Sequence, residues 1–358
     1  MNELYADPSC LDHEPGETVV RDASDADRAA WDAFVAARAD GTAFHWYGWR
    51  PALRDVMGYD TRYLLARRGE RVVGVLPLAA VSSRLWGRSV TSLPFCSYGG
   101  PVAVDAAATE ALERAAGAYA ESRGAPFVEL RRTACAHPDW PRQDLYVTFR
   151  KALPAVIGDD LKAIPQKRRN MVRRAISNGL TADVGRDIDA FYELYAENAR
   201  AHGTPALSKR FLARLLDELG ARTDILFVRD RDGRPISGIM NLLHGDSLHA
   251  GFAGEVASAR ELAANDFKYL KLMQHARAHG CGVFDFGRSK RGTGSFEFKR
   301  LWGFEPTPLH YEFMMLAGGQ VPQNNPSNPK FQLAMRVWTR LPRFVVDRLG
   351  PKVIHGLG

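Results

Sequence analysis

The chain has 358 residues, of which 46% are apolar and 25% are charged, and its formal net charge is +7. This composition is ordinary for a globular protein, and the length allows two cores of about 100–200 residues each. No run approaches the ~20 apolar residues of a membrane span, which excludes an integral membrane protein of the helical class. Four scattered cysteines and no apparent signal peptide predict reduced thiols and a cytoplasmic location.

The first half of the chain follows a recognisable order of elements. Helical sequence at 25–39 precedes two apolar segments at 62–81 that are separated by Arg68-Gly69-Glu70, which predicts an antiparallel hairpin. A helix-forming run at 106–123 then leads through Gly124 into the apolar strand PFVELRR.

The second half repeats this order. Helical sequence at 187–202 and 208–219 precedes a predicted hairpin at 222–244, a further strand SLHAGFAG, a helix at 260–279 and the strand GVFDFG. One supersecondary unit therefore occurs twice, and its mixture of helices, hairpin and returning strand predicts an α/β (α+β mixed sheet) layer fold.

This order divides the chain into consecutive parts. We expect an N-terminal tail at 1–20, a first domain at 21–155, a second domain at 156–317 with a basic helix at 161–179, a linker at 318–329 and a basic amphipathic C-terminal helix within 330–358.

The C-terminal segment 330–358 carries six Lys or Arg residues and one acid, Asp347, so its charge is 6 − 1 = +5. Its apolar residues fall on one helical face and its cations on the other. Such a helix either docks on the body of the protein or lies on an anionic membrane surface, which would make the protein peripheral at the inner face.

The basic helix at 161–179 has an apolar stripe and a cationic side. Met171, Val172, Ala175 and Ile176 share the stripe, but Arg168 projects from its middle. A guanidinium there pairs with a structural acid, splays to solvent or anchors a phosphate or carboxylate of a ligand. The candidate binding residues on this helix are Arg168, Arg169, Asn170 and Arg173.

The run K-R-R-N-M-V-R-R-A-I-S-N-G-L at 167–180 resembles the signature helix of the Fem-type (FemAB-like) peptidyltransferases, which are tandem GNAT proteins. The runs F-D-F-G-R-S, F-K-R-L-W-G-F-E-P and P-F-C-S-Y-G-G-P resemble an exosortase (PEP-CTERM)-associated bacterial subgroup. Together these motifs cover most of residues 20–316, and the resemblance implies two tandem GNAT-like acyltransferase domains.

The resemblance also implies a reaction. An amine of a cell-envelope or exopolysaccharide precursor would attack an activated acyl group carried by aminoacyl-tRNA or acyl-CoA, with no tightly bound cofactor. The site must orient both reactants, stabilise the oxyanion and remove a proton. In the Fem group a Phe-Lys pair lies by the reacting centre, and Phe298-Lys299 matches it. Lys299 would place a cation near the oxyanion or a donor phosphate, and the alternative is a surface lysine.

Four further residues are candidates. Asp285 points away from Phe284 and Phe286 on a strand, where it either carries a raised pKa and acts as a base or accepts backbone hydrogen bonds. The binding candidates are Arg288 at the end of that strand, Asn265 at the start of the helix at 260–279, and Tyr98 of the P-F-C-S-Y-G-G-P run. Asn265 either lines a site or caps the helix.

Two departures limit the resemblance. Neither repeat carries R/Q-x-x-G-x-G/A before its long helix, which argues against ordinary acetyl-CoA binding. No sustained heptads predict a coiled-coil arm, so any tRNA contact would come from the basic helix or the tail. We predict no metal site. The alternative function is a non-catalytic scaffold with a degenerate acyltransferase fold at the membrane surface.

Overall fold

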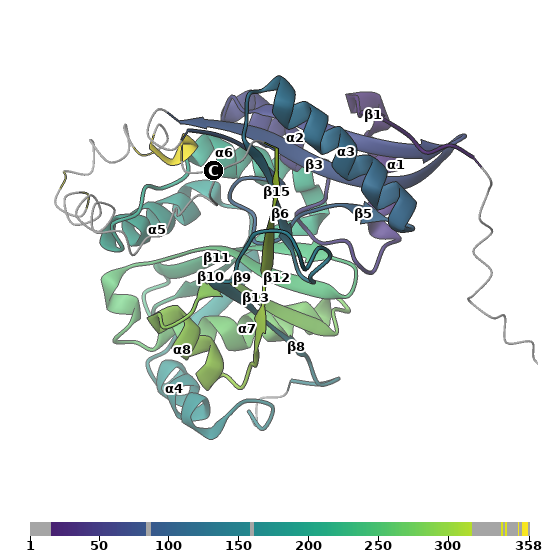
Figure 1. The fold of residues 1–358 in the computed structure, drawn as a ribbon. Coiled ribbons are helices and arrows are strands. Elements are labelled where there is room, and N and C mark those ends of the chain that lie inside the picture. The colour runs from purple at the N-terminus through teal and green to yellow at the C-terminus, as the bar shows by residue number, and fades with distance from the viewer. Residues whose placement is uncertain are drawn as a thin grey trace, which may run out of the picture.

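The computed structural model describes residues 16–83, 87–157, 161–316, 338, 341, 350 and 353–356. Its core consists of two mixed β-sheets, with the elements of sheet A in the upper half and those of sheet B in the lower half of Figure 1. In spatial order, sheet A contains β1 (Val19–Asp22), β2 (Asp60–Arg68), β3 (Arg71–Ser83), β4 (Gly87–Thr91), β6 (Phe127–Arg132), β15 (His310–Met315) and β7 (Arg142–Gln143), with β5 (Val102–Ala103) beside β3. Sheet B contains β14 (Pro306–Pro308), β8 (Tyr146–Ala152), β13 (Val283–Lys290), β12 (Ser247–Glu255), β11 (Pro235–His244), β10 (Thr223–Arg229) and β9 (Thr181–Gly185).

Helices cover both sheets. Their bounds are α1 (Arg28–Ala36), α2 (Trp49–Pro51), α3 (Ala106–Ser122), α4 (Gln166–Ser177), α5 (Ile188–Ala201), α6 (Lys209–Leu219), α7 (Ala264–Ala278) and α8 (Gly294–Leu301), with 3-10 turns at Asp25–Asp27, Gly220–Arg222 and Ala257–Ala259 and a π-helical turn at Ala52–Val56. Several begin at side-chain caps: Asp105, Asp187, Ser208 and Thr293 each accept a backbone N–H of the first turn.

The predicted repeat is confirmed. Each half has an antiparallel hairpin, β2–β3 or β10–β11, then a further strand, β4 or β12, a long helix and a returning strand, β6 or β13, that pairs in parallel with that further strand. The mixed α/β fold class is confirmed with it.

Each sheet takes a strand from the other half of the chain. β8, which lies inside the predicted first domain, pairs with β13 and β14 of sheet B. β15, near the end of the predicted second domain, pairs with β6 and β7 of sheet A. The two halves are therefore joined by backbone hydrogen bonds as well as by side-chain packing. The predicted N-terminal tail also overlaps β1, which begins at Val19.

Alternation along the strands creates three apolar layers. One core lies between sheet A and α3, and another between sheet B and the helices α4, α7 and α8. The third and largest lies between the two sheets and includes Trp31, Tyr98, Phe211 and Phe227. The helices of the outer layers lie above and below the sheets in Figure 1.

The basic helix forms at α4 and is followed by Gly179 at φ +77°. Val172 and Ala175 of the predicted stripe are buried, but Ile176 is 53% exposed, which corrects its assignment to the buried face. The helix ends at Ser177, so Ile176 lies in its last turn. The predicted linker at 318–329 and most of the amphipathic segment 330–358 lie outside the described residues. Within the described part of the chain, every helix is too short or too polar to cross a bilayer.

Candidate functional site

The side chain of Asp285 forms the centre of a buried polar cluster between the two sheets. Asp285 is 3% exposed on β13 and accepts hydrogen bonds from the hydroxyl of Tyr98 at 3.0 Å to each carboxylate oxygen. Thr148 of β8 donates at 3.4 Å, and the N–H of Gly287 donates at 2.7 Å. Nδ1 of His249, on the neighbouring strand β12, lies 3.4 Å from the carboxylate. The cluster therefore draws on both halves of the chain.

The pKa of Asp285 is lowered, which corrects the prediction of a raised value. Burial alone would raise this pKa, but His249, Arg150 and the N–H of Gly287 outweigh burial and leave it below its usual value. Asp285 is consequently an ionised carboxylate at neutral pH and a weak base. The other predicted interpretation, an acceptor of backbone hydrogen bonds, matches the bond from Gly287.

Lys299 lies on α8 with its ammonium group turned inward. It is 6% exposed, and Nζ donates to the carbonyl oxygens of Gly287 and Arg288 at 3.0 Å each. Burial lowers the pKa of Lys299 to about 7, an effect that Asp285 opposes and Arg288 reinforces. The alternative of an ordinary surface lysine is excluded by this burial. An ammonium has three N–H donors, and two of them reach these carbonyls.

Arg288 connects sheet B to the strand β15 of sheet A. Its Nη1 donates to the hydroxyl of Tyr311 at 3.0 Å, and that hydroxyl donates to the carbonyl oxygen of Ser97 at 2.8 Å. The guanidinium also lies 4.8 Å from the ring centre of Tyr146. Arg288 is thus part of the contact between the sheets, next to the carbonyls that hold Lys299.

The loop that carries Tyr98 has a strained backbone. Leu93 and Phe95 adopt positive φ angles of 75° and 68°, a region that non-glycine residues rarely occupy. Nη1 of Arg131 holds the loop by donating to the carbonyl oxygens of Leu93 and Cys96 at 3.1 Å each. The strained loop places the Tyr98 hydroxyl against Asp285, and strain of this kind is concentrated at functional sites.

A second group of predicted residues lies where α4, α7 and α8 meet. Arg168 Nη1 is 3.1 Å from a carboxylate oxygen of Asp266, which supplies the acidic partner that the apolar stripe required. The same guanidinium lies 5.8 Å from the ring centre of Phe298. Asn265 is half-buried beside Asp266, and α7 has no side-chain cap, so the capping interpretation of Asn265 is wrong.

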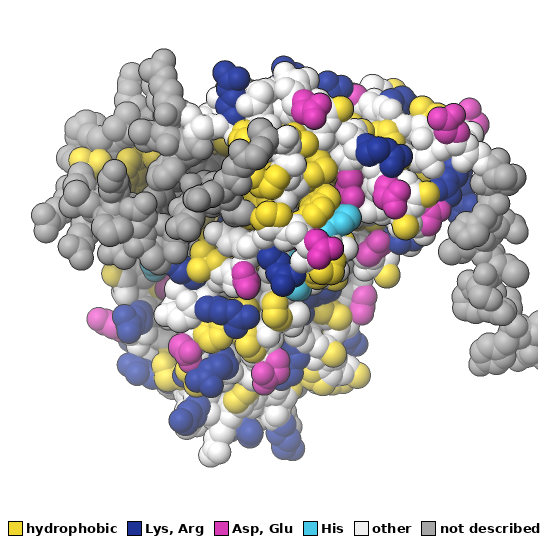
Figure 2. Space-filling view, viewed as in Figure 1, with side chains coloured by type: hydrophobic (Ala, Val, Ile, Leu, Met, Phe, Trp, Pro, Cys, Tyr) yellow, Lys and Arg dark blue, Asp and Glu magenta, His cyan; other side chains and the backbone are white. Residues whose placement is uncertain are grey.

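The remaining candidates on α4 do not join either group. Asn170 and Arg173 are exposed and bond to each other at 3.3 Å, and Arg169 donates to the carbonyl oxygen of Ile164 at 3.0 Å. Figure 2 shows Lys and Arg side chains over the part of this face where α4 and α8 lie. These residues form a cationic surface, separate from the buried cluster.

The parallel strands β12 and β13 pair only briefly and then separate. Their register ends at His249 opposite Asp285, after which β12 continues to Glu255 beside β11 and β13 continues to Lys290 beside β8. Each strand has a bulge just beyond this point: Gly251 is the extra residue of β12 against β11, and Gly287 lies in the irregular step of β13 against β8.

Glycine is required at position 287, where the two strands separate, for two reasons. Its φ is +72°, and a Cβ there would lie 3.0 Å from the His249 ring and 3.5 Å from the carbonyl oxygen of Ala250. The two strands are therefore still close where they begin to diverge, and the carbonyl of Gly287 that binds Lys299 is at that position. We call the site formed by Gly251, Gly287 and Lys299 the strand mouth.

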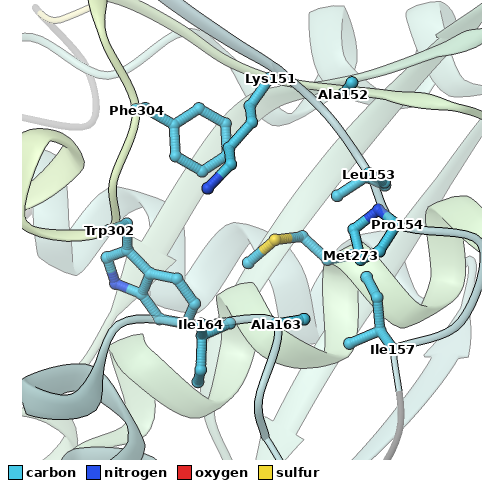
Figure 3. Close-up of a pocket in the computed structure, with 10 residues that line it drawn as sticks. All are labelled: Lys151, Ala152, Leu153, Pro154, Ile157, Ala163, Ile164, Met273, Trp302 and Phe304. Atoms are coloured by element: carbon cyan, nitrogen blue, oxygen red, sulfur yellow. The ribbon is translucent and has the colours of Figure 1, made fainter.

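A small pocket lies apart from the strand mouth. Figure 3 shows Met273 of α7 between the side chains that follow β8 and the aromatic rings of Trp302 and Phe304. Lys151 extends toward these rings, with Nζ 5.5 Å from the ring centre of Phe304. The pocket contains none of the predicted site residues, so it carries no part of the chemistry considered below.

Sequence reasoning missed His249, Thr148 and Gly251. The signal for His249 was present, because SLHAGFAG and GVFDFG are the two strands that flank the long helix and pair in parallel. Aligning them in register brings His249 opposite Asp285. Thr148 could not be found in this way, since β8 enters sheet B from the other half of the chain.

Residues 166–300 match the model of the acetyltransferase (GNAT) domain family. The matched segment runs from α4 to α8 and contains the strand mouth. This match supports an acyltransferase. No curated protein is significantly similar to the chain in sequence.

Solved structures resemble the chain in fold over most of its length. The crystal structure of FemX is 16% identical, with a TM-score of 0.62, and the alignment covers 88% of this chain and 100% of FemX. The C-terminal domain of a putative lysylphosphatidylglycerol synthetase from Agrobacterium fabrum is 18% identical over 81% of this chain and 92% of that one, with a TM-score of 0.56. A tandem GNAT protein from the clavulanic acid biosynthesis pathway is 14% identical over 85% and 99%, with a TM-score of 0.53. At these identities the likeness is one of fold, and the fold is that of tandem GNAT proteins.

Proposed function

We propose that the chain is an N-acyltransferase that moves an acyl or aminoacyl group to an amine, and that the strand mouth is its reaction centre. The observation that carries this proposal is the position of Lys299. Its Nζ binds the carbonyl of Gly287, two residues beyond the last residue of β13 that pairs with β12, in the segment that matches the acetyltransferase family.

The chemistry requires a positive group near a developing oxyanion. An amine nitrogen attacks the ester or thioester carbonyl carbon, the tetrahedral oxyanion collapses, the C–O or C–S bond breaks, and the amine proton passes to the leaving group. Two N–H groups of the Lys299 ammonium reach the carbonyls of Gly287 and Arg288, and we assign the third to that oxyanion. Donors fixed in this way contribute about 10²–10³ in turnover.

The roles of the other residues follow from their contacts. Asp285 and Tyr98 are positioning residues in this proposal: the Asp285 carboxylate fixes Gly287 from one side and its charge favours the ammonium form of Lys299. Arg168 of α4 contacts Asp266 in the first turn of α7 and the ring of Phe298 on α8, so we place the anionic donor at the N-terminus of α7.

Two donors remain distinct alternatives. The absence of a glycine-rich pyrophosphate loop and the exposed cations of α4 favour aminoacyl-tRNA, while acyl-CoA fits the matched family. Mass spectrometry of products from a panel of aminoacyl-tRNAs and acyl-CoAs, with amine-bearing envelope and exopolysaccharide precursors as acceptors, identifies the donor. We propose the exosortase-associated role only for the acceptor, which would be an amine-bearing exopolysaccharide precursor.

Salt dependence tests the tRNA alternative independently of turnover. If α4 binds tRNA, the affinity for tRNA falls at least ~10-fold between 50 and 200 mM salt. The Arg173→Gln/Arg174→Gln double variant then reduces the slope of log affinity against log salt concentration by about 1–2. Arg234→Gln, an exposed cation in the β10–β11 turn, is the matched control. Salt-insensitive binding, or equal slopes in both variants, would exclude tRNA recognition by α4.

A second candidate is a non-catalytic protein bound to an anionic membrane. It is favoured by Ile176 and Leu301, which are 53% and 42% exposed on the two helices that carry the cationic surface. Sedimentation with phosphatidylglycerol vesicles tests it, using Ile176→Gln and a chain lacking residues 330–358. Vesicle binding without any acyl product would favour this candidate, and catalysis with no vesicle binding would exclude it.

A further inference from the structure

A cluster of metal-ligating side chains lies on the outer face of sheet B. Asp224 is near the start of β10, and His275 and His279 are at the end of α7. One ligand atom from each of the three residues lies within 4.8 Å of the other two. Nε2 of His275 is 2.7 Å from Oδ2 of Asp224, and the two imidazole ring centres are 4.2 Å apart.

The sequence carries a direct signal for this cluster. His275 and His279 have the spacing H-x-x-x-H, in the run HARAH, which places both rings on one face of a helix. The prediction of no metal site did not take this histidine pair into account. Asp224 could not be added from spacing alone, because β10 meets α7 only through the tertiary fold.

Surrounding hydrogen bonds orient the cluster as they do in metal sites. Nδ2 of Asn241 donates to Oδ1 of Asp224 at 2.8 Å, which leaves Oδ2 facing the histidines. Nδ1 of His279 is 3.0 Å from the carbonyl oxygen of His275, so Nδ1 carries the proton and Nε2 is free to bind a metal.

We propose that Asp224, His275 and His279 bind one divalent transition-metal ion of the Zn²⁺ class. Two imidazole nitrogens and one carboxylate oxygen are a donor set that suits zinc, whereas Mg²⁺ and Ca²⁺ select oxygen ligands. Tetrahedral ligand atoms lie about 3.3 Å apart when each bond is about 2.0 Å. His279 is exposed, so a small shift of its side chain can close the remaining distance.

This metal site is separate from the strand mouth. Asp266, which pairs with Arg168, is at the N-terminal end of α7, and thirteen residues at 1.5 Å each place His279 about 20 Å away. Asp285 is on the opposite face of sheet B, which faces the first half of the chain. The ion would fasten the C-terminal end of α7 to β10 and leave a coordination position open to solvent.

Titration calorimetry of the full chain, without a polyhistidine tag and in a buffer that does not bind metals, tests the proposal with ZnCl₂ and with MgCl₂. We expect one Zn²⁺ per chain, no comparable Mg²⁺ binding, and a rise in the unfolding temperature with zinc. His279→Gln and Asp224→Asn should each weaken zinc binding at least ~10-fold.

His202→Gln is the matched control, because His202 is exposed at the end of α5 and its Nδ1 contacts the carbonyl oxygen four residues earlier, as in His279. This variant should bind zinc as the parent does. Absence of stoichiometric zinc binding in the parent would overturn the proposal. So would unchanged affinity in His279→Gln, an exposed variant that is expected to fold normally.

Discussion

Tyr98 and Asp285, 187 residues apart in the chain, are joined by hydrogen bonds of 3.0 Å from one hydroxyl to both carboxylate oxygens. Tyr98 belongs to the strained loop after β4, and Asp285 to the strand that begins the mouth in sheet B. The contact is fully buried, so the loop of one half of the chain supports the proposed reaction centre in the other.

Tyr98→Phe should destabilise the protein by about 1–3 kcal/mol, because the buried Asp285 carboxylate loses the hydroxyl that donates to both of its oxygens. Urea unfolding measures the change. Tyr119→Phe is the control, since its hydroxyl donates at 3.0 Å to the backbone carbonyl of Asp60, a neutral acceptor, and should cost less. Equal decreases in the free energy of unfolding would show that the bond to the Asp285 carboxylate stabilises the protein no more than a bond to a neutral carbonyl.

Asp285→Asn should lower the pKa of Lys299 below about 7, because the Asp285 charge is what opposes the effect of burial on that lysine. Titration of ¹³C-labelled lysine side chains by NMR measures it directly. Asp183→Asn removes an exposed carboxylate that pairs with Arg229 and should leave Lys299 unchanged. An unchanged Lys299 pKa in Asp285→Asn would contradict the electrostatic link between these residues.

Local patterns predicted most of the fold. The hairpins, the long helices and the returning strands are each defined by residues close in sequence: Gly69 makes the first hairpin turn at φ +55°, and Gly280 follows α7 at φ +76°. The exchange of β8 and β15 between sheets could not be predicted, because their pairing depends on contacts between distant segments.

The candidate site was predicted in part. Asp285, Arg288 and Lys299 were each singled out from the sequence, and the structure brings them close together. Their geometry was not predictable, because the inward turn of Lys299 depends on α8, which begins at the Thr293 cap. The sequence placed the cation of Arg168 on an apolar helical face, where it needs an acidic partner, and the structure supplies Asp266.

Arg168→Met should cost about 3–5 kcal/mol, because Asp266 would remain buried without its cation. The double variant Arg168→Met/Asp266→Asn should recover part of this loss, and a double-mutant cycle in urea measures the coupling. The pKa of Asp266 is already raised by burial against the influence of Arg168, so the single variant should also gain relative stability at low pH. Additive effects would mean that the pair is not coupled.

His45 should make stability depend on pH. It is buried between α1 and α2 with Nε2 3.1 Å from the carbonyl oxygen of Gly100, and burial lowers its pKa to about 4. The unfolded state, with a pKa near 6.5, binds more protons between pH 6.5 and 4, so stability falls by up to about 3 kcal/mol across that range. Urea unfolding at several pH values should show a flatter profile for His45→Gln than for His202→Gln. Parallel profiles would contradict the assignment.

The turnover of Lys299→Met with the identified donor tests the central proposal most directly. Lys271→Met is the control, because Lys271 lies on α7 with its ammonium 5.5 Å from the ring centre of Phe267. If Lys299 stabilises the oxyanion, kcat should fall about 10²–10³-fold while donor affinity changes by less than about 3-fold, and Lys271→Met should retain parent turnover. An unchanged kcat in folded Lys299→Met, or no acyl transfer by the parent chain from any donor, would contradict the proposal.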